Sequence, residues 1–155
     1  FIEEYLHCCK PLANAIDRLQ DEKSCFYGDL LPTLISIKNK LKKIQNLSWH
    51  YCDELVPGRI DALTGRHKRF FEVEHEGSMS AVAAAFHPQH KLRWIKCLSV
   101  DARKKTIQAI KDALSTIEPI TDLQISAETD NTDDFFDFSV DGKQNEKILF
   151  VKSVY

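Results

Sequence analysis

Three short stretches of this sequence bring together the soft side chains that bind transition metals. A histidine stands beside cysteines at residues 7–9 and near one at residues 50–52, and two histidines flank a Pro-Gln pair at residues 87–90. None of them has two cysteines separated by two residues, the spacing that lets one loop wrap a tetrahedral zinc ion. Adjacent helical residues such as Cys8 and Cys9 also point in different directions. The sequence therefore predicts buried or half-buried thiols and surface histidines, with no bound metal.

Acidic side chains offer a second kind of chemistry, because clustered carboxylates can hold Mg²⁺. Asp133, Asp134 and Asp137 lie close together, but they fall in a polar stretch that we expect to be an acidic linker. No serine sits in a glycine-flanked elbow, and no Cys/His pair forms a recognisable local signature. The chain has only five glycines, from which no phosphate-cradling loop can be built. We therefore expect neither a catalytic residue nor a cofactor in this chain.

Basic residues form a third group, whose chemistry would be phosphate neutralisation on DNA. The candidate DNA contacts are Arg66, Lys68, Arg69, Lys91, Arg93, Arg103 and Lys104. Residues 1–117 contain 18 Lys/Arg and 14 Asp/Glu, which is a modest positive excess for a dedicated nucleic-acid binder. Solvated helix faces are the alternative explanation for the same side chains.

The elements that position these side chains are predicted to be helices. The clearest pattern has apolar residues at alternating four- and three-residue steps, at Leu30, Leu34, Ile37, Leu41 and Ile44. A first helix is predicted from the apolar positions Ile2, Tyr5, Leu6, Cys9, Leu12, Ala13, Ile16 and Leu19, and a last one from Ile107, Ile110, Leu114 and Ile117. The expected fold is an all-α, irregular bundle of about five to six helices, followed by an acidic, poorly structured tail.

Helix boundaries follow from capping and breaking residues. Asp29 and Ser99 are predicted N-caps, and Ser78 or Ser80 is expected to cap the alanine-rich helix after them. The Pro-Gly pair at residues 57–58 is predicted to break the chain between two helices.

The chain divides by charge into three predicted parts. Residues 1–117 form the helical domain, residues 118–141 hold eight acidic and no basic residues and form the linker, and residues 142–155 start a further segment. The chain begins at Phe1 and its only methionine is Met79, so we expect a piece of a longer protein. Five cysteines without regular spacing favour free thiols in a reducing compartment. No apolar run approaches the ~20 residues needed to span a bilayer, so no membrane partner is expected.

Three phrases occur in an order and spacing that resemble a known family. Residues 11–20 read PLANAIDRLQ, residues 28–34 read GDLLPTL, and residues 82–95 read VAAAFHPQHKLRWI. Together they resemble the C-terminal half of hAT-superfamily transposases and of their domesticated relatives, such as the zinc-finger BED proteins. Acidic residues 133–138 stand where that family often has an acidic linker. The resemblance covers about residues 1–117 and this linker.

The resemblance implies a position within a larger DNA-cutting protein. Such enzymes use a triad of acidic residues and divalent metal on an RNase H-like fold, with a helical domain inserted between the second and third acids. This chain resembles the later part of that insertion, although the Cys-x-x-His phrase that marks the insertion's start is absent here. The catalytic acids, and any divalent metal, are therefore expected outside this chain, and Asp133, Asp134 and Asp137 do not replace them.

We therefore expect a non-catalytic helical scaffold in the nucleus, which supports DNA binding or subunit assembly and contacts DNA, further copies of itself or other proteins. One alternative is a protein-interaction module of a domesticated protein with no DNA role, whose stripe from Leu30 to Ile44 pairs with a partner helix. Another is a metal-dependent enzyme centred on the His/Cys groups.

Overall fold

The structure of this chain is a computed structural model that describes residues 1–21, 23–116, 136 and 138. These residues form helices and connecting loops with no strand among them, which confirms the predicted all-α class. In chain order the elements are α1 (Ile2–Leu19), the 3-10 turn η1 (Tyr27–Asp29), α2 (Leu30–Gln45), α3 (Leu55–Arg66), α4 (Lys68–Phe71), α5 (Glu76–Phe86), the 3-10 turn η2 (Ile95–Cys97) and α6 (Val100–Ser115).

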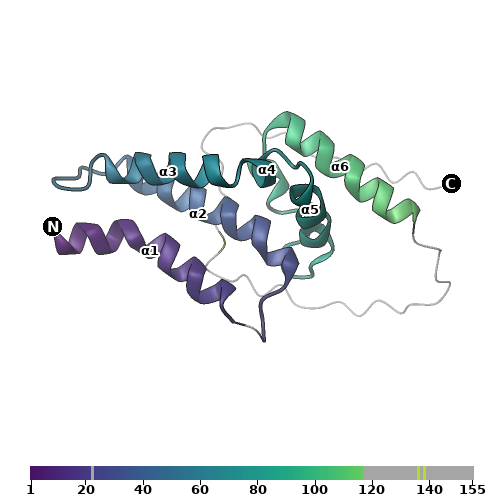
Figure 1. Cartoon of the computed structure of the whole chain (residues 1–155), viewed down its shortest axis with the longest axis horizontal. Helices are drawn as coiled ribbons and strands as arrows, with labels where there is room; N and C mark the ends of the chain where they lie inside the picture. Colours follow the sequence, from purple (N-terminus) through teal and green to yellow (C-terminus); the bar gives the residue numbers. More distant parts are fainter. Residues whose placement is uncertain (22, 117–135, 137, 139–155) are drawn as a thin grey trace.

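Figure 1 shows that α1, α2 and α3 run alongside one another at one end of the molecule, while α5 and α6 pack together at the other. The predicted linker 118–141 lies outside the described residues, apart from Phe136 and Phe138, and the predicted segment 142–155 lies wholly outside them. No helix in the described part of the chain is both long enough and apolar enough to cross a membrane.

Helix α2 is the central element, because nearly every neighbour packs against it. It contacts α1, α3, α4, α5 and η1, and every side chain from Leu31 to Ile37 is buried. When side chains are buried around the whole circumference of a helix, neighbouring elements must pack against every side of it. Of the predicted stripe, Leu34, Ile37 and Leu41 are buried within this chain. Leu30 and Ile44 at its two ends are only partly buried. The middle of the stripe is therefore covered by the domain itself.

The core consists of three clusters of buried residues. The first surrounds the fully buried Trp94 and takes residues from α2, α5, η2, α6 and the segments outside these elements: Leu31, Ile35, Val73, Ala81, Ala84, Ile95, Leu98, Ala102 and Phe138. The indole N–H of Trp94 donates to the Lys91 carbonyl at 2.9 Å, so the ring is buried with its polar atom paired. The second lies between α1, α2 and α3, where Ala15, Ile37 and Leu41 pack together. The third joins Cys8 of α1 to Cys52 and Val56.

The face of α1 that packs on the core is not the face that carries its large apolar residues. Its buried residues are Cys8, Pro11 and Ala15, and the helix continues through Pro11 without ending. Ile2, Leu6 and Ile16 are instead 70%, 61% and 52% exposed. The predicted helix is therefore present, but α2 and α3 pack against the face that carries Cys8, Pro11 and Ala15.

The predicted break at residues 57–58 is also wrong. Helix α3 begins at Leu55, so Pro57 and Gly58 lie in its first turn. Proline is tolerated there because the N–H that it lacks would have no partner within the helix. Gly58 has open space around it, so nothing in the packing opposes the helix.

The start of α5 differs from the prediction, whereas the start of α6 agrees with it. Helix α5 begins at Glu76, so neither Ser78 nor Ser80 caps it. Ser99 does cap α6, since its hydroxyl accepts the backbone N–H of Ala102 at 3.2 Å. Helix α6 then packs through small residues, with Ala102 and Thr106 buried.

The outward face of α6 carries large aliphatic side chains. Val100 and Leu114 are 64% and 51% exposed, and Ile107 between them is exposed as well. These three positions are seven residues apart, so they lie along one side of the helix. Ile107 and Leu114, two residues of the predicted stripe, therefore point away from the core.

Two residues of the predicted linker pack onto the helical domain. Phe138 is buried in the core around Trp94, and the Phe136 ring lies stacked 5.7 Å from it between centroids. The Cys97 thiol donates to the Phe138 carbonyl at 3.5 Å. At these two positions the expectation of a free acidic linker is wrong, because the helical domain itself supplies the apolar surface that the phenylalanines need.

Candidate functional site

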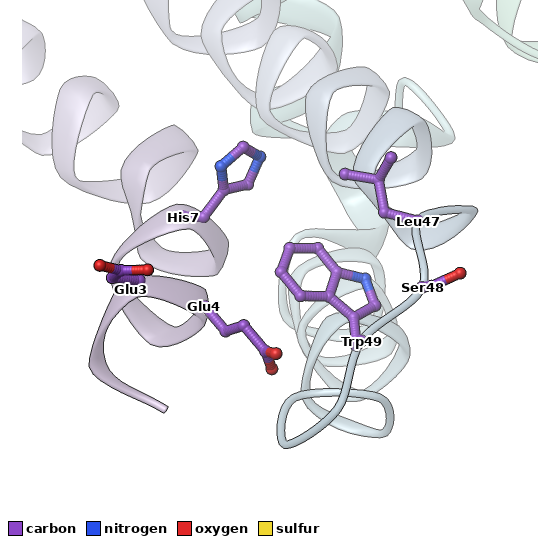
Figure 2. A pocket seen from close by; sticks show the side chains of 6 residues that line it. All are labelled: Glu3, Glu4, His7, Leu47, Ser48 and Trp49. Carbon is purple, nitrogen blue, oxygen red and sulfur yellow. The ribbon is translucent and has the colours of Figure 1, made fainter.

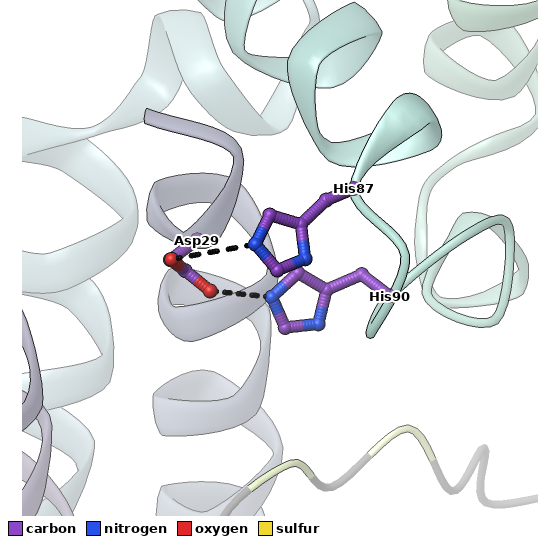
Figure 3. Close-up of side chains that lie close together, drawn as sticks. All are labelled: Asp29, His87 and His90. Carbon is purple, nitrogen blue, oxygen red and sulfur yellow. Dashed lines mark hydrogen bonds and ion pairs between the residues drawn. The ribbon is translucent and has the colours of Figure 1, made fainter. Parts of the chain in front are cut away.

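One buried cluster of titratable side chains joins two distant parts of the sequence. Asp29 is the last residue of η1 and leads into α2, while His87 ends α5 and His90 lies in the following turn. Figure 3 shows both imidazoles pointing at the Asp29 carboxylate from the α5 side. The packing of η1 against α5 brings the two parts together.

The geometry of this cluster is that of one carboxylate shared by two imidazoles. His90 Nε2 lies 2.6 Å from Asp29 Oδ1, and His87 Nε2 lies 3.9 Å from Asp29 Oδ2. The two rings are stacked, with centroids 4.7 Å apart and planes inclined by 25°. Asp29 and His90 are each 1% exposed, whereas His87 is only partly buried. Access from solvent is therefore through His87.

Backbone contacts fix the position of Asp29. The Phe26 N–H donates to Asp29 Oδ2 at 2.8 Å, which turns the carboxylate back over η1. Gly28 brings this turn so close to α5 that a Cβ there would lie 2.8 Å from the Ala83 carbonyl oxygen. Asp29 occupies the N-cap position of α2, but its side chain makes no cap hydrogen bond. The predicted capping of α2 by Asp29 is wrong, because the Asp29 carboxylate interacts instead with the Phe26 N–H and the two histidines.

The turn after α5 fixes the two histidines. The His87 carbonyl accepts the N–H of His90 at 3.1 Å and that of Lys91 at 2.9 Å, and Lys91 takes a left-handed backbone with φ 50°. The Gln89 N–H donates to His87 Nδ1 over a longer 3.3 Å. The Phe136 ring packs edge-on against His90 with centroids 4.3 Å apart, so it covers one side of the cluster.

Burial decides the charge of His90. It lowers the pKa of His90 below the usual range of an imidazole, against the opposing hydrogen bond and charge of Asp29. The ring is therefore neutral at neutral pH. Since an ionised carboxylate can only accept, the proton of this neutral ring sits on Nε2 and is donated to Asp29.

The cluster has the composition of a metal site rather than of a nucleophilic one. Asp29, His87 and His90 each place one ligand atom within 4.8 Å of the other two. No serine or cysteine of the described residues is hydrogen-bonded to either imidazole, as an activated nucleophile would be. Two histidines and one carboxylate are, by contrast, a ligand set found around zinc and iron.

Sequence reasoning marks two of the three residues of this cluster. The His-Pro-Gln-His pattern contains both histidines, but the interpretation of His90 as a surface histidine is wrong, since it is 1% exposed. The sequence predicts Asp29 as a helix cap, and it lies 61 residues before His90. No local spacing connects the two, so only the packing of η1 on α5 could reveal the pair.

Of the predicted DNA contacts, three lie together at the junction of α3 and α4. Arg66, Lys68 and Arg69 are all exposed there. Lys68 Nζ lies 3.7 Å from Glu72 and Arg69 Nη1 lies 3.9 Å from Glu76. Both cations keep 68% of their side chains exposed, and exposed pairs of this kind are weak. Acidic neighbours therefore moderate the positive charge of this group without burying it.

The other four predicted contacts lie on different elements. Lys91 and Arg93 belong to the turn between α5 and η2, where Arg93 is only partly exposed. Arg103 and Lys104 are on α6, and the Arg103 Nη2 donates to the Lys96 carbonyl at 3.1 Å. The seven predicted DNA contacts are thus distributed over α3, α4, the turn after α5 and α6.

A shallow hollow of about 400 Å³ lies between the start of α1 and the loop after α2. Figure 2 shows Trp49 standing between the two, with His7 and Glu4 on the α1 side. The Glu4 carboxylate accepts the Tyr51 N–H at 2.8 Å, and the Trp49 indole N–H donates to the Ile44 carbonyl at 2.9 Å. Glu4 and Trp49 thus hold the loop to α1 and α2.

Comparison of the sequence with models of protein families, with curated proteins and with solved structures gave no match.

Proposed function

We propose that this chain is a non-catalytic helical scaffold domain of an hAT-type transposase, or of a nuclear protein descended from one, and that it serves subunit assembly. The observation that carries the proposal is the outward face of α1. Its large aliphatic side chains are exposed, while the core is built from the small residues of the opposite face. A contiguous apolar face of this kind on a soluble domain marks an interaction site.

The outward face of α1 has the spacing of a helix-pairing seam. Alternating four- and three-residue steps connect Ile2, Leu6, Cys9, Ala13 and Ile16. This repeat places side chains along one line of the helix and lets two helices pack knobs-into-holes. At its centre the small residue Ala13 is exposed, whereas Cys9 is partly buried and its Sγ accepts from Arg59 Nη2 at 3.0 Å. The partner with a matching seam that the chain itself supplies is α1 of a second copy.

The assembly proposal is tested by sedimentation velocity of the chain over a range of micromolar concentrations. Wild type is expected to dimerise, and Leu6→Glu is expected to stay monomeric because it places a charge in the seam. Met79→Glu is the matched control, since Met79 is also a large apolar residue, 67% exposed, but lies on α5. Wild type that is monomeric throughout, or Met79→Glu that dissociates as readily as Leu6→Glu, would refute assembly through α1.

A second candidate function is DNA binding through Arg66, Lys68 and Arg69. The supporting observation is that these cations lie together and exposed at the junction of α3 and α4. Cations that contact phosphates release counterions, so binding weakens steeply as salt rises. Three phosphate contacts correspond to roughly 2.7 units of slope in log affinity against log salt.

Fluorescence anisotropy with a duplex oligonucleotide over a salt series measures this slope. Replacing the three cations together by alanine is expected to remove most of the slope. A control variant with Lys10, Lys23 and Lys111 replaced by alanine changes the net charge equally and is expected to keep it. Equal losses in both variants would show that only net charge matters, and no binding at low salt would reject a DNA role for this chain.

The family proposal rests on the three ordered phrases and on the helical character of residues 1–116. It predicts that the gene of the parent protein encodes an RNase H-like core around this segment, with its acidic residues outside it. A parent without such a core would refute the assignment. The interaction-module alternative keeps the assembly role and lacks the DNA role, so the two experiments above distinguish it from the leading proposal.

A further inference from the structure

We propose that Asp29, His87 and His90 form a binding site for one divalent transition-metal ion, with Zn²⁺ the best match to the ligand set. The site would hold the turn before α2 against the turn after α5. Neither the proposed assembly role nor the proposed DNA role depends on it.

The ligand types favour zinc over the hard alkaline-earth cations. Two imidazole nitrogens and one carboxylate oxygen are ligands of zinc, whereas Ca²⁺ and Mg²⁺ take oxygen ligands. Asp29 and His90 are buried and His87 is partly exposed, which leaves one open side for the ion to enter and for a water ligand. The cluster thus resembles zinc sites with three protein ligands and a free fourth position.

The distances require only small movements. Zinc ligands at about 2.0–2.1 Å in tetrahedral geometry stand about 3.3 Å from one another. His90 Nε2 and Asp29 Oδ1 approach to 2.6 Å because a proton lies between them, and one ligand atom from each of the three residues lies within 4.8 Å of the other two. Replacing the Nε2 proton of His90 by the ion lengthens the short separation, and drawing in the partly exposed His87 shortens its distance to the other two ligands.

The surroundings of the cluster are suited to hold the ligands in place. The Phe26 N–H already binds Asp29 Oδ2, which leaves Oδ1 for an ion. Two hydrogen bonds to the His87 carbonyl close the turn from His87 to Lys91. They hold in place the backbone from which both imidazoles project. Binding through His87 Nε2 moves the ring proton to Nδ1 and gives up the 3.3 Å contact with Gln89, which is a long and therefore weak hydrogen bond.

The test is isothermal titration of the whole metal-free chain with zinc chloride, in a reducing buffer without chelator. Wild type is expected to bind one ion and to melt at a higher temperature in its presence. His87→Ala is expected to weaken binding at least tenfold, and this partly exposed position can be replaced without opening the core. His50→Gln is the matched control, because His50 is an exposed histidine on another loop, and it is expected to bind as wild type does.

Cobalt spectroscopy separates this site from binding to the free cysteines. Cys25 lies four residues before Asp29 and is partly buried, so Cys25→Ser is the variant for thiolate chelation. The proposal expects Co²⁺ binding without a thiolate charge-transfer band, retained in Cys25→Ser and lost in His87→Ala. It is overturned if wild type binds no ion, if His87→Ala binds as tightly as wild type, or if Cys25→Ser abolishes binding.

Discussion

Replacing Gly28 by alanine is expected to destabilise the domain and to disturb the Asp29–His90 contact beside it. An added Cβ would lie 2.8 Å from the Ala83 carbonyl oxygen, 3.1 Å from its carbonyl carbon and 3.2 Å from the His87 Cβ. The first two atoms are backbone of α5 and cannot rotate away, so η1 and α5 must move apart. Overpacking of this kind costs about 1–3 kcal/mol, and two backbone contacts at once favour the middle of that range, about 2 kcal/mol.

The matched control is Gly65→Ala. Gly65 lies inside α3 and has no atom within 4 Å of an added Cβ. Alanine there is expected to stabilise the helix by roughly 0.5–1 kcal/mol, because glycine loses more backbone entropy on folding. The two glycine-to-alanine changes are therefore expected to act in opposite directions.

Urea unfolding of both variants, followed by far-ultraviolet circular dichroism, measures the two free energies of unfolding. The Nε2 proton of His90 in wild type and in Gly28→Ala can be followed by nuclear magnetic resonance, since lengthening of the 2.6 Å contact shifts it. If Gly28→Ala is as stable as wild type, η1 does not pack on the α5 backbone, and the geometry of the whole cluster fails with it.

Three further predictions concern the core, a cap and a thiol. Trp94→Ala is expected to lower the free energy of unfolding by about 3–5 kcal/mol in the same urea assay, because it empties the centre of the larger core. Ser99→Ala is expected to cost about 1 kcal/mol, since the Ala102 N–H loses its cap, and hydrogen exchange at that amide should rise. Burial, with Cys52 adding to it, raises the pKa of the Cys8 thiol to about 11 from 9.0, so mass spectrometry should show iodoacetamide labelling at Cys8 at least about a hundredfold slower than at an ordinary thiol.

The sequence predicted the fold class and several helix ends, but it misjudged which faces are buried. Periodicity in α2 predicted one apolar stripe, and the structure buries the helix on all sides from Leu31 to Ile37. The reason is that Thr33 and Ser36 are small enough to pack under neighbours although they are polar, and both are buried. In α1, by contrast, large apolar residues such as Leu6 are exposed although they belong to the predicted apolar face. Periodicity locates an apolar face, but it does not say whether this chain covers it.

The candidate site was only partly predictable, because its central contact is between residues far apart in the chain. The His-Pro-Gln-His pattern is visible in the sequence, and its two histidines do stack on one another. Which of them is buried depends on Asp29, and Asp29 reaches His90 only because Gly28 allows η1 to touch the α5 backbone. An aspartate before an apolar run is a common N-cap, so the local sequence contains no sign of this long-range role.

Helix α2 gives a physical reason why the exposed faces of α1 and α6 suit a scaffold. Its first half, with Leu31 and Ile35, belongs to the core that also holds α6, whereas Ile37 and Leu41 belong to the core that holds α1. The two outward apolar faces are therefore fixed to opposite ends of one buried helix. A change that loosens α2 should weaken both faces together, whereas a change on either outward face should leave the other intact. In the scaffold role that we propose, the domain would hold two separate partner surfaces at a set distance, and this role requires packing and no catalytic group.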